Sequence, residues 1–72
     1  MAKPHNIDTT LLEYYIEKSG LKITYICKAL GITEMSFKRK RNNQTEFKVS
    51  EMYILCDILK IPEKDRQKIF FP

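Results

Sequence analysis

The 72-residue sequence contains one histidine, two cysteines and two glycines. The histidine, His5, has too few potential partners for a zinc site or a catalytic pair, and two glycines do not make a phosphate-binding loop. The longest apolar run, Met52–Cys56, is too short for a membrane span or for the apolar part of a signal peptide. These absences predict a cytoplasmic protein that is not an enzyme and that has no metal, cofactor, membrane or small-molecule partner.

The net charge of +4 is concentrated in one segment of the chain. Ser36–Lys48 contains five basic residues and one acidic residue, a net of +4, whereas the rest of the chain has eight of each sign. A neutral body with one cationic segment is typical of a protein that binds a polyanion through one face.

Apolar residues recur at helical spacing, and no stretch shows the alternation of a strand. The spacing predicts helices near residues 9–19, 23–30, 34–42, 49–59 and 62–70, in an all-α domain over residues 8–72 that follows an N-terminal arm, residues 1–7. Cys27 and Cys56 fall on apolar stripes, so we expect two buried thiols rather than a disulfide.

Polar residues and glycines predict where these helices begin and end. Thr10 has capping-box spacing with Glu13, and Asp8 or Thr9 are alternative caps for the first helix. Thr33 is expected to cap the third helix. Gly20 and Gly31 are suited to end the first two helices in a left-handed conformation, and Asn42–Asn43 the third.

The string GLKITYICKALGITEMSFKRKRNN, Gly20–Asn43, resembles the Cro/C1-type (XRE-like) helix-turn-helix family. The resemblance rests on the turn Gly31, the cap Thr33 and an apolar frame formed by Leu21, Ile26, Leu30, Ile32 and Phe37. It extends to Ile61, and the closing IFFP is similar to the end of small regulators from phages of Gram-positive bacteria. One departure is notable: the family often buries Leu or Ile near positions 40 and 41, where this chain has Lys40 and Arg41.

The resemblance implies a five-helix, lambda-repressor-like bundle that binds double-stranded DNA with its third helix in the major groove and regulates transcription as a repressor or Cro-like protein. It places base-reading side chains on the exposed face of the third helix: Glu34, Met35, Lys38 and Arg39. Candidate phosphate contacts surround them: Lys22, Thr33, Lys40, Arg41, Asn42, Asn43, Gln44 and Lys48.

Four apolar residues are not needed for the predicted core and form a candidate homodimer interface: Tyr53, Ile54, Phe70 and Phe71. Operators of the family are commonly two-fold symmetric, which favours a dimer. Two other interpretations remain open. One is a protein-interaction module, such as an antirepressor or adaptor, on the same frame. The other is the DNA-binding domain of a longer repressor.

Overall fold

Five α-helices and no strand make up residues 7–71, the part of the chain that the computed structural model describes. The helices are α1 (Thr9–Ser19), α2 (Ile23–Leu30), α3 (Glu34–Arg41), α4 (Val49–Ile58) and α5 (Glu63–Phe70). The all-α prediction is confirmed, and each helix end lies within one residue of its expected position. Within these residues, no helix is long and apolar enough to cross a membrane.

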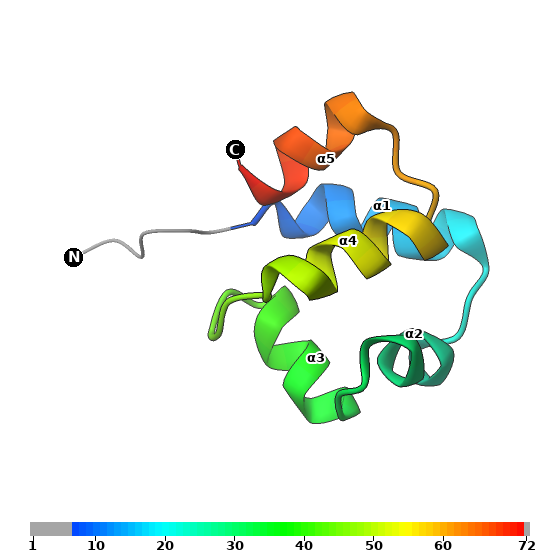
Figure 1. Cartoon of the computed structure of the whole chain (residues 1–72), viewed down its shortest axis with the longest axis vertical. Helices are drawn as coiled ribbons and strands as arrows, with labels where there is room; N and C mark the ends of the chain where they lie inside the picture. The colour runs from blue at the N-terminus through cyan, green and yellow to red at the C-terminus, as the bar shows by residue number, and fades with distance from the viewer. Residues whose placement is uncertain (1–6, 72) are drawn as a thin grey trace.

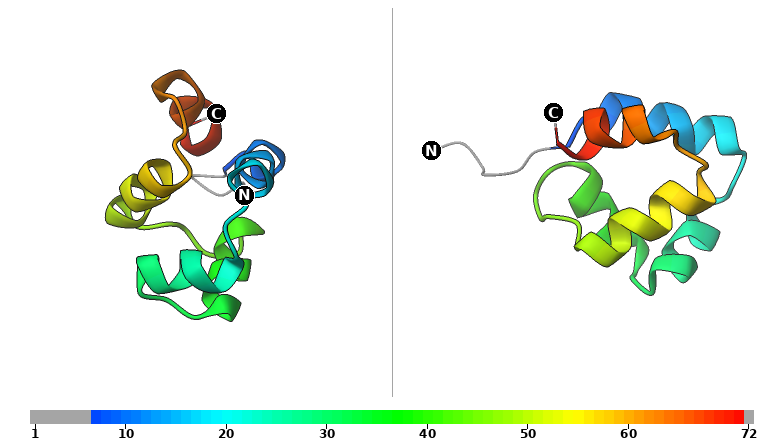
Figure 2. Two further views of the ribbon diagram at one scale, coloured as in Figure 1. Left: turned by 90° about the vertical axis from the view of Figure 1, so that its right-hand side faces the viewer. Right: turned by 45° about the horizontal axis from the view of Figure 1, so that its top comes forward.

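The helices pack in neighbouring pairs (Figure 1). α1 and α5 lie beside each other (Figure 2). α2 packs against α4 and against α3, and Figure 1 shows α2 nearly end-on and α3 lying across the view. α2 and α3 therefore lie together on one side of the molecule.

One apolar core joins all five helices. Phe37 of α3 and Phe70 of α5 are almost completely buried, and Phe47 from the α3–α4 loop lies between them. The Phe47 ring meets the Phe37 ring edge-to-face at 6.1 Å and the Phe70 ring at 6.0 Å between centroids. Such edge contacts favour a fixed geometry beyond simple burial. Phe47 therefore connects the third helix to the fifth.

The capping residues explain why the helices end where they do. Gly20 and Gly31 adopt φ values of +72° and +73°, as expected from the sequence. Asp8 caps α1, since its Oδ1 accepts a hydrogen bond from the Leu11 N–H at 3.1 Å. Asp8 is therefore the N-terminal cap of α1, and the predicted capping box of Thr10 and Glu13 is not. Lys60 also adopts a left-handed φ, +53°, after α4, which the sequence did not suggest.

The start of the described chain packs into the fold. Residues 1–6 of the expected arm lie outside the described residues. Ile7, assigned to that arm, is instead buried in the core. The Asp8 N–H donates to the Ile69 carbonyl at 2.8 Å, which ties the first helix to the last.

A hydrogen bond between two side chains forms a second link between α1 and α5. The Tyr15 hydroxyl donates a hydrogen bond to Oδ2 of Asp65. This hydrogen bond, together with burial of the ring and the negative charge of Asp65, raises the pKa of Tyr15 to about 12. Tyr15 is therefore held in its protonated form.

Both cysteines are buried and free, as predicted. Burial raises the pKa of the Cys27 thiol in α2 and of the Cys56 thiol in α4, because an apolar surrounding disfavours the thiolate.

Candidate nucleic-acid interface

The turn between α2 and α3 is closed by backbone hydrogen bonds. The Gly31 N–H donates to the Lys28 carbonyl at 3.2 Å, and the Ile32 N–H donates to the Cys27 carbonyl at 3.0 Å. The left-handed conformation of Gly31 makes this pattern possible at low cost. The Thr33 hydroxyl then accepts from the Ser36 N–H at 3.1 Å and starts α3, as predicted. The turn therefore fixes the direction of α3 relative to α2.

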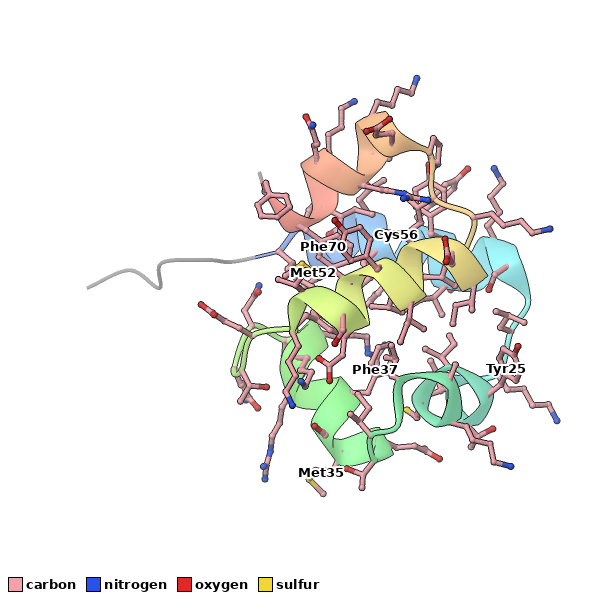
Figure 3. All side chains as sticks on the ribbon, viewed as in Figure 1. Tyr25, Met35, Phe37, Met52, Cys56 and Phe70 are labelled. Atoms are coloured by element: carbon pink, nitrogen blue, oxygen red, sulfur yellow. The ribbon has the colours of Figure 1, made fainter. Side chains whose placement is uncertain are left out.

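The third helix has one buried face and one exposed face. Phe37 points into the core, whereas Met35 points away from the protein (Figure 3). Residues spaced by four lie on one side of a helix, so Glu34 lies on the same side as Lys38, and Met35 lies on the same side as Arg39. All four are exposed. We call these four residues the reading face.

The cations of the reading face have no protein partner. Within residues 7–71, no ion pair or hydrogen bond engages the side chain of Lys38 or Arg39. Both lie on the second turn of a helix that the core holds in place through Phe37. They are therefore available to an external anion or base edge.

Lys40, by contrast, is not available to a phosphate. Its side chain is only 10% exposed, and its Nζ lies 2.7 Å from Oε1 of Glu51 in α4. The Nζ also lies 3.4 Å from the Glu46 carbonyl and above the Phe47 ring. Because a buried and paired ammonium cannot reach the DNA backbone, Lys40 is withdrawn from the predicted phosphate set.

Arg41 also turns toward the body of the protein. Its guanidinium carbon lies 5.0 Å from the Phe37 ring centroid, and its Nη1 lies 3.9 Å from a Glu13 carboxylate oxygen of α1. Its Nε is buried without a hydrogen-bond partner among the described residues. This position does not fit the phosphate contact that was expected of Arg41.

Asn43 serves the fold rather than the surface. It adopts φ +62°, the left-handed conformation expected of it. Its Oδ1 accepts from the Ile7 N–H at 2.8 Å, and its Nδ2 donates to the Ile7 carbonyl at 3.3 Å. Because both polar atoms of its side chain already form hydrogen bonds with the Ile7 backbone, Asn43 is not available for the predicted phosphate contact.

The remaining phosphate candidates lie on the surface: Lys22, Thr33, Asn42, Gln44 and Lys48. The Gln44 N–H donates to the Arg39 carbonyl at 2.9 Å, which holds the loop after α3 close to the reading face. Of the five cations in Ser36–Lys48, only Lys38, Arg39 and Lys48 are exposed and form no ion pair with another described residue. Fewer cations are therefore available to a polyanion than the number of basic residues in the segment indicates.

Glu51 is the important residue that the sequence did not suggest. Burial alone would raise the pKa of its carboxyl, but hydrogen bonds from Lys40 Nζ and from the Lys48 N–H outweigh burial and lower that pKa. Its spacing of three from Lys48, at the third position of α4, is the signal that could have indicated a capping role.

The four residues of the candidate dimer interface differ in how exposed they are in the structure. Tyr53 and Phe71 are each about two-thirds exposed. Ile54 packs against the core, and Phe70 is 1% exposed, so Phe70 is a core residue rather than a protruding one.

Comparisons with known proteins add no identification: no family model matches the chain, and no curated protein or solved structure matches it either. Within the described part of the chain, no group of three or more His, Cys, Asp or Glu side chains could hold a metal ion.

Proposed function

We propose that this protein is a sequence-specific double-stranded DNA-binding transcriptional regulator of the phage repressor or Cro-like type. Its five helices would form a lambda-repressor-like bundle, with α3 in the major groove. One observation carries the proposal: Lys38 and Arg39 are exposed and, among residues 7–71, have no side-chain partner, and they lie on the helix that follows the Gly31–Thr33 turn, whose opposite face is fixed in the core. Such a helix presents side chains to base edges at low entropic cost.

The chemistry of the reading face suits base recognition. The planar guanidinium of Arg39 can donate to guanine O6 and N7 together, and Lys38 can donate to the same atoms less directionally. The exposed Met35 can contact a thymine methyl group, and Glu34 can accept from cytosine N4. Alternatively, Glu34 contributes only favourable charge at the positive end of the helix dipole.

The surrounding residues are suited to hold the DNA backbone. Lys22 precedes α2, and Lys48 precedes α4, so each lies beside helix N–H groups that favour an anion. Asn42 and Gln44 can add neutral hydrogen bonds to phosphate. The mechanism would be occupancy of a promoter or contact with polymerase in the cytoplasm, with no chemistry of its own.

Selection of bound sites from a random duplex pool, at a stated salt concentration, tests the proposal. An enriched motif is the expected result, and paired half-sites about 10 base pairs apart would indicate a two-fold dimer. Absence of any enrichment, together with no salt-dependent mobility shift on duplex DNA, would favour the protein-interaction module instead.

A further inference from the structure

Met35 is the one apolar member of the reading face, and the other three members are charged. The Met35 side chain is 63% exposed and, as Figure 3 shows, points away from the protein. A single exposed apolar residue is ordinary on a protein surface. The informative feature is its position, because Met35 lies four residues before Arg39 on the same side of α3.

The spacing of these two side chains matches the spacing of neighbouring base pairs. An α-helix rises about 1.5 Å per residue, so Met35 and Arg39 are separated by about 6 Å along the axis of α3. Successive base pairs of duplex DNA are about 3.4 Å apart. With α3 lying in the major groove, the base pairs within reach of Met35 are therefore those one or two steps from the base pair that Arg39 contacts.

The chemistry of a thioether limits what Met35 can recognise in the groove. Its sulfur donates no hydrogen bond and accepts only weakly, so it does not distinguish the O4 atom of thymine from the N4 amino group of cytosine. Apolar side chains contact the C5 methyl group of thymine, and the flexible, polarizable methionine adapts to such a surface. 5-Methylcytosine carries the same methyl group at the same place, whereas cytosine and uracil carry none.

We propose that α3 reads a pyrimidine methyl group through Met35, one or two base pairs from the guanine that Arg39 is proposed to contact. The base at this position is then thymine or 5-methylcytosine, and unmethylated cytosine binds less well. The inference rests on the proposed function and adds a form of regulation to it. Methylation of a cytosine at this position would strengthen binding without any change in the base sequence.

The position of Met35 allows the methyl contact to be tested without disturbing the fold. Met35 is not part of the apolar core that the described residues form, and Met, Gln and Leu have similar helix propensities. Met35→Gln keeps the length of the side chain and replaces its apolar end by an amide, whereas Met35→Leu keeps an apolar end. Lys48→Ala is the matched control, because Lys48 is a phosphate candidate that lies outside α3. Far-UV spectra verify that each variant keeps its helices.

Titration of the full chain with the duplex enriched from a random pool, at a fixed salt concentration, tests the proposal. The base pair at which Arg39→Ala loses its preference marks the proposed guanine. Each thymine within two base pairs of it is then replaced by uracil, which pairs alike but lacks the methyl group. One of these replacements should weaken wild-type binding by about fourfold, a factor that corresponds to about 0.8 kcal/mol, the value for one buried methylene-sized group. At the same position, 5-methylcytosine should bind about fourfold more tightly than cytosine.

Met35→Gln should bind the thymine and uracil duplexes alike. Met35→Leu and Lys48→Ala should keep the preference for thymine, the latter with lower affinity for both duplexes. The proposal is overturned, with DNA binding intact, by an enriched duplex in which no thymine lies within two base pairs of a guanine that depends on Arg39, by equal wild-type binding to thymine and uracil, or by a preference that persists in Met35→Gln. A chain that enriches no duplex would overturn the proposed function together with this inference.

Discussion

Lys40 Nζ lies 2.7 Å from Glu51 Oε1, and both side chains are at most 10% exposed. The pair joins the end of α3 to the start of α4, and Glu51 also accepts from the Lys48 N–H at 2.8 Å. Removing one partner from a buried ion pair leaves the other charge without compensation. The orientation of α3 therefore depends on a residue, Glu51, that lies in α4, outside the α2–α3 pair.

Glu51→Ala should lower the free energy of unfolding by about 3–5 kcal/mol, because it strands the Lys40 ammonium in the core. Urea unfolding measures this loss. The double variant Lys40→Met/Glu51→Leu should recover most of it, since well-packed apolar residues often replace a buried ion pair without loss. Equal stability of Glu51→Ala and the wild type would show that the pair contributes little.

The same pair predicts a sensitivity to acid. The pKa of Glu51 lies below its ordinary value of 4.5, so its stabilising effect is complete above pH 4.5 and is lost as the pH falls through the folded-state pKa. The double variant, which has no carboxyl at position 51, should lack this part of the acid transition. Identical acid transitions in both proteins would contradict the assignment.

The salt dependence of DNA binding should reflect the cations proposed to contact phosphate, Lys22 and Lys48, rather than all five cations of Ser36–Lys48. Each neutralised phosphate contributes about −0.9 to the slope of log K against log salt, so these two predict a slope of about −2. Lys48→Ala should reduce the magnitude by about 0.9 on all sequences alike. Lys40→Met/Glu51→Leu, which removes a buried cation, should leave the slope unchanged. A reduced slope in that variant would place Lys40 on the DNA after all.

Arg39→Ala should weaken binding at the preferred site by about 1–3 kcal/mol and relax the preference at one base pair. Binding to random duplex should fall much less, because a base contact contributes little there. Competition assays with preferred and random duplexes measure the difference, with Lys48→Ala as the phosphate control. Equal weakening on both duplexes would assign Arg39 to phosphate and leave base reading to Glu34, Met35 and Lys38.

Tyr15 should titrate above the ordinary pH range of a tyrosine. Its pKa of about 12 exceeds the ordinary value of 10.0 chiefly because of its hydrogen bond to Asp65. The corresponding stability is fully present below pH 10.0 and is lost as the pH rises toward 12. Tyrosinate absorbance should lose its last step in Tyr15→Phe, and Asp65→Asn should move that step to lower pH. An unchanged titration in Tyr15→Phe would refute this.

The sequence predicted the helices well because their ends are determined locally. Thr33 and Gly31 act within four residues of their own positions, and apolar spacing needs no partner. Lys40 could not be assigned this way, since its burial depends on Glu51, eleven residues along the chain. Ile7 is similar, because its backbone is held by Asn43, 36 residues away. The structure therefore differs from the sequence-based prediction at positions whose partners lie far along the chain.

The two buried thiols have a practical consequence. Cys27 lies in α2 and Cys56 in α4, and an alkylating reagent requires an exposed thiolate, which burial and a raised pKa both suppress. Each thiol is then modified only when its own helix opens. The native chain thus carries one such thiol in α2 and one in α4. The ratio of their modification rates in dilute reagent would reveal whether α2 opens alone or only when the whole molecule unfolds.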